Sequence, residues 1–121
     1  MEKLYKQYRD TSQWLLVYID EVQPADGWQA ETKVESGYEV DQPENIEERL
    51  AMARICHKKL RISLPVIVDN LDDKTSADYA GWPDRLYIVD KEGKIAYKGR
   101  KGPGGFRLME MKEALNRILN L

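Results

Sequence analysis

Two short apolar runs constrain the fold of this chain more than any other feature of its sequence. WLLVYID spans residues 14–20 and PVIVD spans residues 65–69, and each run ends on an acid. Continuous apolar runs rich in β-branched residues are typical of strands that are covered on both faces, as in parallel sheets. Between them, residues 44–61 place a stripe at helical spacing (Ile46, Leu50, Ala53, His57 and Leu60). The pattern predicts an α/β sheet flanked by helices.

The other segments extend this alternation. Apolar spacing predicts helices over residues 2–11 and 106–120, and residues 73–80 are predicted as a short helix that ends near Gly81. Two β runs, LYIVD and KIAYKG, are joined by a short turn in which Gly93 suits a positive φ, so they predict a hairpin. Residues 21–43 are polar and rich in glycine and proline, which predicts a long loop, and loops of this length are often functional.

Length and composition indicate one domain over residues 1–121. A net charge of −2 gives no reason to expect nucleic acid or an anionic membrane as a partner. No apolar run is long enough to span a bilayer, and the start, MEKLYKQYRD, has no apolar centre of the signal-peptide kind. With a single cysteine, Cys56, nothing indicates an oxidising compartment, and we expect a cytoplasmic protein.

The residue types that usually carry metal or nucleophilic chemistry are scarce. One histidine and one cysteine cannot supply a zinc shell, so we expect no metal. Cys56 and His57 are neighbours on a predicted helix and point about 100° apart, so spacing alone forms no catalytic pair. An ordinary thiol, with a pKa of about 8.5, is mostly protonated at neutral pH. A redox protein based on Cys56 is therefore the least favoured interpretation.

A resemblance to known proteins emerges from several motifs read in order. The segment GWPDRLYIVDKEGKIAYKG resembles thioredoxin-like and peroxiredoxin-like proteins, in which the proline at the position of Pro83 is cis. Together with VYIDEVQPADGW, ENIEERLAMA, PVIVDN and YKGRKGP, it resembles the catalytic domain of the iodothyronine deiodinase family. The resemblance implies a thioredoxin-like (peroxiredoxin-like) fold and an oxidoreductase. Such an enzyme removes iodide from iodothyronine-like aromatics, or performs related thiol and peroxide chemistry, with an external thiol as reductant and no bound cofactor.

The same resemblance implies roles for individual residues. Glu21 falls on an acid of the active-site hydrogen-bond network, and Gln23 falls on a functionally important histidine of the animal enzymes. An amide cannot take up a proton near neutral pH, so acid–base catalysis at Gln23 is in doubt. Trp28, Arg100 and Lys101 are the implied substrate-binding residues, with Arg100 or Lys101 near a basic residue that binds the hormone carboxylate. The alternative for each of these residues is an ordinary solvated loop side chain.

The resembled family also implies a redox residue that this sequence does not contain. There, a cysteine or selenocysteine follows a central strand and directly precedes the first helix, whereas this sequence starts at that helix. We therefore expect a domain that is N-terminally truncated relative to the family, without its first central strand, and inactive as written. The alternative is a non-catalytic ligand-binding or regulatory module in which Glu21, Gln23, Trp28 and Lys101 line a vestigial cleft. A small aromatic or peroxide substrate and a homodimer are the partners that the resemblance implies.

Overall fold

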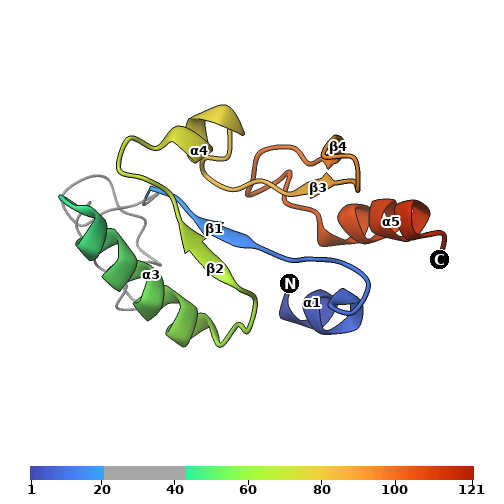
Figure 1. Ribbon diagram of the computed structural model, residues 1–121, viewed down its shortest axis with the longest axis horizontal. Coiled ribbons are helices and arrows are strands. Elements are labelled where there is room, and N and C mark those ends of the chain that lie inside the picture. The colour runs from blue at the N-terminus through green and yellow to red at the C-terminus, as the bar shows by residue number, and fades with distance from the viewer. Residues whose placement is uncertain (21–42) are drawn as a thin grey trace. The chain divides into compact units, whose positions relative to one another are not determined.

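The computed structural model describes residues 1–20 and 43–121 of the chain (Figure 1). Helices and strands alternate through most of it, so the predicted α/β class is confirmed, and the architecture is consistent with a thioredoxin-like fold. The described elements are α1 (Glu2–Tyr8), β1 (Leu16–Tyr18), α3 (Ile46–Leu60), β2 (Val66–Val68), α4 (Lys74–Asp78), β3 (Tyr87–Val89), β4 (Ile95–Lys98) and α5 (Leu108–Leu119).

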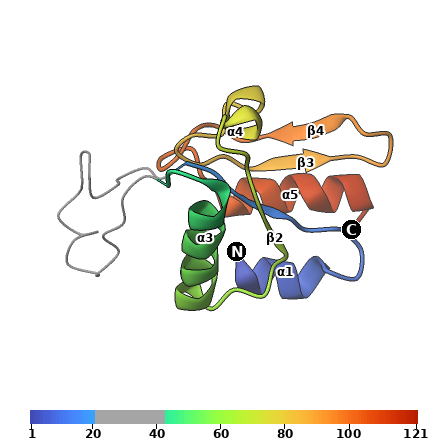
Figure 2. The same ribbon diagram turned by 60° about the vertical axis from the view of Figure 1, so that its left-hand side comes forward.

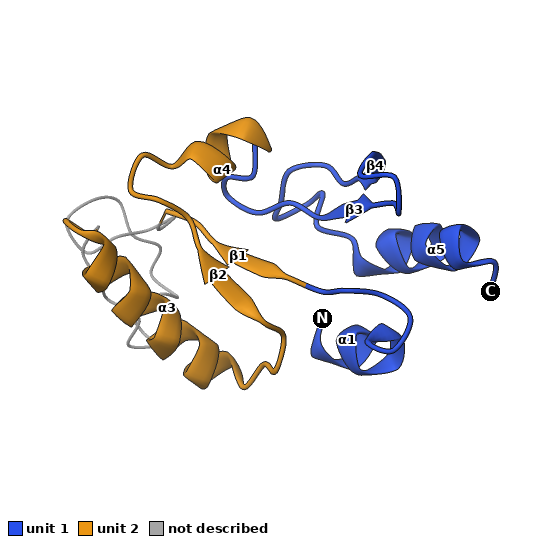
Figure 3. Ribbon diagram, in the orientation of Figure 1, with its two compact units in different colours: residues 1–14, 80–121 blue, residues 15–79 orange. Residues whose placement is uncertain are grey.

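The chain forms two compact units, which are coloured separately in Figure 3. Unit 1 consists of residues 1–14 and 80–121, and unit 2 consists of residues 15–79. The described strands form two separate two-stranded sheets, one in each unit. None of the described helices is both long and apolar enough for a bilayer span. The single domain over residues 1–121 stays a prediction.

Unit 2 is a parallel β–α–β arrangement. β1 and β2 pair in parallel, with Leu16 opposite Val66 and Tyr18 opposite Val68. Parallel neighbours require a crossover connection, and α3 lies in that connection and packs against β2 (Figures 1 and 2). The expectation of strands covered on both faces is wrong for β2, because Ile67 is 48% exposed.

Helix α3 begins where the sequence places acids and ends where it places bases. Asn45 caps its N-terminus by accepting a hydrogen bond from the Glu48 backbone N–H (2.9 Å), and the Glu48 side chain accepts one from the Glu44 N–H (2.8 Å). The first bond satisfies a donor that the first turn leaves open, and the second fixes the residue before the cap. At the other end, Arg61 has a left-handed backbone (φ +53°) that stops the helix.

Unit 1 contains the predicted hairpin, β3 with β4, and the terminal helices of the chain. Gly93 has φ +80° in the turn, as the sequence predicted for it. α5 lies along the hairpin (Figure 2). The core is formed by five buried side chains from α1, α5 and the residue before β3: Leu4, Tyr8, Leu86, Met111 and Leu115. The Tyr8 hydroxyl donates a hydrogen bond to Asn116, which ties α1 to α5 at the edge of this core.

Candidate functional site

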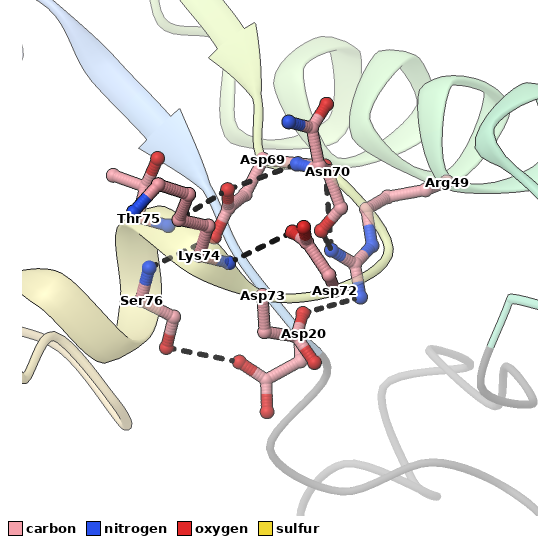
Figure 4. A network of polar contacts seen from close by, with 9 residues as sticks. All are labelled: Asp20, Arg49, Asp69, Asn70, Asp72, Asp73, Lys74, Thr75 and Ser76. Atoms are coloured by element: carbon pink, nitrogen blue, oxygen red, sulfur yellow. Dashed lines mark hydrogen bonds and ion pairs between the residues drawn. The ribbon is translucent and has the colours of Figure 1, made fainter.

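A polar network lies at the carboxyl ends of β1 and β2, the edge at which ligands bind in open parallel sheets (Figure 4). Asp69 directly follows β2 and is buried. Its Oδ1 accepts hydrogen bonds from the backbone N–H groups of Asn70 (2.9 Å) and Thr75 (3.1 Å), and its Oδ2 accepts one from that of Ser76 (2.8 Å). The Ser76 hydroxyl in turn donates to Oδ1 of Asp20, just after β1 (3.3 Å). Asp69 and Ser76 thus fix α4 to the ends of both strands.

The electrostatics of Asp69 assign it a structural role. Burial alone would raise the pKa of this carboxyl, but the backbone hydrogen bonds from Ser76, Thr75 and Asn70 outweigh it and hold the pKa below its ordinary value. Asp69 is therefore a carboxylate at neutral pH, when its oxygens accept hydrogen bonds and have no proton to give. General acid chemistry at this position is excluded by that charge state.

Arg49 links helix α3 to the same network. Its side chain is only 3% exposed, and its Nη1 donates to the carbonyl oxygens of Asn70 (2.7 Å) and Asp69 (3.3 Å). Its Nη2 forms an ion pair with Oδ1 of Asp73 at 2.8 Å (Figure 4). A guanidinium presents donors in a rigid fork and can hold several acceptors at once. Arg49 therefore fixes the loop between β2 and α4, but neither it nor the carboxylates can supply electrons to a substrate.

A second candidate region is the glycine-rich loop after β4, which belongs to unit 1. A shallow hollow of about 180 Å³ lies on it, lined by Arg100, Lys101, Gly104, Gly105 and Arg107. The sequence interpretation named Arg100 and Lys101 as substrate-binding residues, and the structure brings them together with a third cation, Arg107. Near this loop, burial raises the pKa of the Tyr97 phenol, Glu110 raises it further and Arg100 opposes the shift. Tyr97 therefore stays protonated at neutral pH.

Pro83 lies in the same unit as this loop. The Trp82–Pro83 peptide bond is cis, the isomer that the resemblance implies, and so is the Gly102–Pro103 bond. The Gly102 N–H donates to the carbonyl oxygen of Asp84 at 2.9 Å, which ties the glycine-rich loop to the residue after Pro83. The hollow and the Pro83 segment are thus parts of one connected region.

The other residues named from the sequence divide into two groups. Glu21, Gln23 and Trp28 lie outside the described residues. Cys56 and His57 are half-buried on α3. Among the residues that the structure describes, no three His, Cys, Asp or Glu side chains are grouped so that they could hold a metal ion.

Sequence reasoning missed three residues that the structure makes prominent. Asp69 had a usable signal, because an acid that directly follows a buried strand often caps the next helix. Arg49 had none, since a charged residue next to an apolar stripe is usually solvated. Arg107 was missed because the loop folds back on itself, and only that fold places it beside Arg100 and Lys101.

The fold and these two regions define a mixed α/β protein with a rigid polar network in one unit and a cationic loop in the other. Comparison with known proteins then gives the family. The chain matches the iodothyronine deiodinase family model over residues 1–119. It is 34% identical over 119 residues to thyroxine 5-deiodinase of Sparus aurata, covering 98% of this chain and 43% of that protein. It is 40% identical over 118 residues to type II iodothyronine deiodinase of Neoceratodus forsteri, covering 93% and 42%.

The chain therefore belongs to the iodothyronine deiodinase family, and the family expected from the sequence motifs is confirmed. It spans less than half the length of the curated relatives that it matches, including type I iodothyronine deiodinase of Xenopus laevis, of which it covers 43%.

Proposed function

We propose that this chain is the ligand-binding part of a deiodinase-family oxidoreductase. Its substrate is an iodothyronine-like aromatic acid, and the sulfur or selenium nucleophile is one that these 121 residues do not provide. The observation that supports this most directly is the family match, which runs over residues 1–119. The proposal keeps the same form if the parent enzyme instead performs the related thiol and peroxide chemistry of thioredoxin-like proteins.

The proposed reaction balances with an external thiol as the reductant. The aryl carbon–iodine bond breaks, iodide leaves, and the carbon gains a proton. The two electrons come from two thiols, which become a disulfide. In this scheme Glu21 and Gln23 belong to the hydrogen-bond network around the nucleophile, while Trp28, Arg100 and Lys101 bind the substrate.

The cationic loop supports the substrate class. Arg100 and Lys101 line one hollow, so a single carboxylate placed there would lie beside two positive charges. Hydrogen bonds between charged partners are roughly twice as strong as neutral ones. An aromatic acid is therefore a suitable ligand for this surface.

Cys56 does not supply the nucleophile in this proposal. It is a half-buried residue within α3, outside the first turn of the helix, where a helix N-terminus would favour a thiolate. We therefore expect the 121-residue polypeptide to bind its ligand without turnover. The absence of a second cysteine from the sequence also favours a second candidate, a non-catalytic binding or regulatory module.

One experiment on two polypeptides tests both candidates. Binding of an iodinated diphenyl-ether acid is followed by calorimetry, and iodide release is measured in the presence of dithiothreitol. The two samples are the 121-residue polypeptide and the longest chain that its gene encodes. We expect binding without iodide release from the first and release from the second. Absence of binding by both, or release by the 121-residue polypeptide, contradicts the proposal, and binding by both without release favours the non-catalytic module.

A lysine variant locates the ligand. Lys101→Met removes one charge from the hollow, and we expect it to weaken binding of the iodinated acid by about tenfold, or about 1.4 kcal/mol. Lys94→Met is the matched control, because Lys94 is an exposed lysine in the hairpin turn, paired only loosely with Glu92 (3.7 Å). Equal effects of the two substitutions would place the ligand elsewhere.

A further inference from the structure

The loop after β4 is held in a shape that concentrates positive charge. The Gly102 N–H bonds to Asp84, and the Gly105 N–H donates to the Lys101 carbonyl oxygen at 3.0 Å. A side-chain Cβ at Gly105 would lie 2.5 Å from that oxygen, so only glycine allows the chain to fold back this closely. This reversal brings Arg107 to the same hollow as Arg100 and Lys101.

Among the described residues, two acids lie near these three charges, and the carboxylate of one of them, Asp84, lies beside Gly102. Glu110 lies 3.7 Å from the Arg107 guanidinium, and both side chains are about half exposed, so this ion pair is weak. Neither Arg100 nor Lys101 forms an ion pair with an acid among residues 1–20 and 43–121. All five residues that line the hollow are either cationic or glycine.

A lone carboxylate uses only part of this arrangement. It brings one negative charge and two oxygens, which a single arginine fork can satisfy. Two guanidinium groups and an ammonium group match an anion with more charge and more oxygens. A phosphate group has three free oxygens and a charge of about −1.5 to −2 at pH 7.

We propose that the hollow formed by Arg100, Lys101 and Arg107 binds a phosphate group, as the free ion or as the ester of an aromatic ligand. This inference deepens the proposed function. Only the aromatic ester rests on that function, because the proposed substrate is an aromatic compound. Arg100 and Arg107 each bind a pair of phosphate oxygens, while Lys101 acts as a point charge beside them.

Calorimetry of the 121-residue polypeptide with four probes tests the proposal: inorganic phosphate, sulfate, acetate and phenyl phosphate. We expect phosphate and sulfate to bind at least about tenfold more tightly than acetate at pH 7.5, because both are dianions. Tighter binding of phenyl phosphate than of inorganic phosphate identifies an aromatic ester as the ligand, and the reverse order identifies the free ion. Equal binding of acetate and phosphate, or no binding of either dianion, overturns the proposal.

Measurements at two pH values show whether the charge of the anion, and not only its shape, determines its affinity. Phosphate is mainly a dianion at pH 7.5 and a monoanion at pH 5, while sulfate remains a dianion at both. We expect phosphate affinity to fall several-fold from pH 7.5 to pH 5 with sulfate affinity unchanged, and a parallel fall for both anions overturns the proposal.

Matched arginine variants locate the site. Arg107→Gln removes one charge from the hollow, and Arg117→Gln removes the same charge from the exposed last turn of α5. We expect the first to weaken phosphate binding about tenfold and the second to leave it within twofold, with unchanged circular dichroism for both. Equal losses show a nonspecific charge effect and overturn the proposal. The iodinated acid assay is read separately, so iodide release by the gene's full chain without phosphate binding would leave the proposed function standing.

Discussion

The side chain of Asp69 illustrates how one buried charge organises its surroundings. It is 3% exposed and accepts three backbone hydrogen bonds. Asp69→Asn removes the charge while nearly preserving the volume, and hydrogen bonds to charged groups contribute about 1.5–3 kcal/mol. We expect a loss of about 2 kcal/mol in the free energy of unfolding at pH 7, measured with urea. Asp78→Asn is the control, because Asp78 is exposed and forms a surface ion pair with Lys74.

The pH dependence of this effect has a definite sign. The pKa of Asp69 is lower in the folded protein than the ordinary value of about 3.9 in an unfolded chain. Its contribution to stability is therefore fully present above about pH 4 and is lost as the pH falls through the folded-state pKa. The stability difference between the natural protein and Asp69→Asn should shrink below pH 4, and a difference that stays constant down to pH 2 would show that the charge is not its source.

The helices and strands were largely predictable, because their signals are local. The stripe that begins at Ile46 follows an asparagine cap, and α3 begins at Ile46. Strand ends were less predictable: the apolar run 14–20 yields a β1 of only Leu16–Tyr18. The buried position of Arg49 depends on acceptors some twenty residues away in the chain, so no local pattern could reveal it.

The cap of α3 allows a direct test of this local contribution. Asn45→Ala removes the acceptor for the Glu48 N–H, and loss of such a cap costs about 1 kcal/mol. We expect that loss in urea unfolding, together with a small loss of helical circular dichroism. Glu47→Ala should change the free energy of unfolding by no more than about 0.5 kcal/mol, because Glu47 lies in the same turn but is exposed. Equal losses for the two variants would show that first-turn charge, and not the cap, stabilises the helix.

Two neighbouring glycines of the loop after β4 differ in the space that they leave for a side chain. Gly105→Ala would force a methyl group to within 2.5 Å of the Lys101 carbonyl oxygen, whereas a Cβ at Gly104 has nothing within 4 Å. We expect Gly105→Ala to cost about 1–3 kcal/mol in thermal or urea unfolding. Gly104→Ala should stay within about 0.5 kcal/mol of the natural protein. If both variants are equally stable, the loop relaxes easily and does not fix its cations in place.

Across the whole chain, the order of the motifs was enough to identify the family. No single residue was enough to identify the site. The deiodinase family was identifiable because five motifs occur in sequence along the chain. The candidate site was only partly predictable: Arg100 and Lys101 line one hollow, but Arg107 joins them only through the reversal at Gly105. Glu21, Gln23 and Trp28 lie outside the described residues and stay predictions.

The sole cysteine offers the last test, because it separates a redox protein from a binding part of one. Cys56 is half-buried within α3, away from the N-terminal turn that favours a thiolate. We expect Cys56→Ser to leave binding of an iodinated aromatic acid within about twofold of the natural polypeptide. Consumption of dithiothreitol with that acid or with hydrogen peroxide should stay at the buffer rate in both. A thiol-consuming activity that disappears in Cys56→Ser would make this cysteine the nucleophile and remove the need for one beyond these 121 residues.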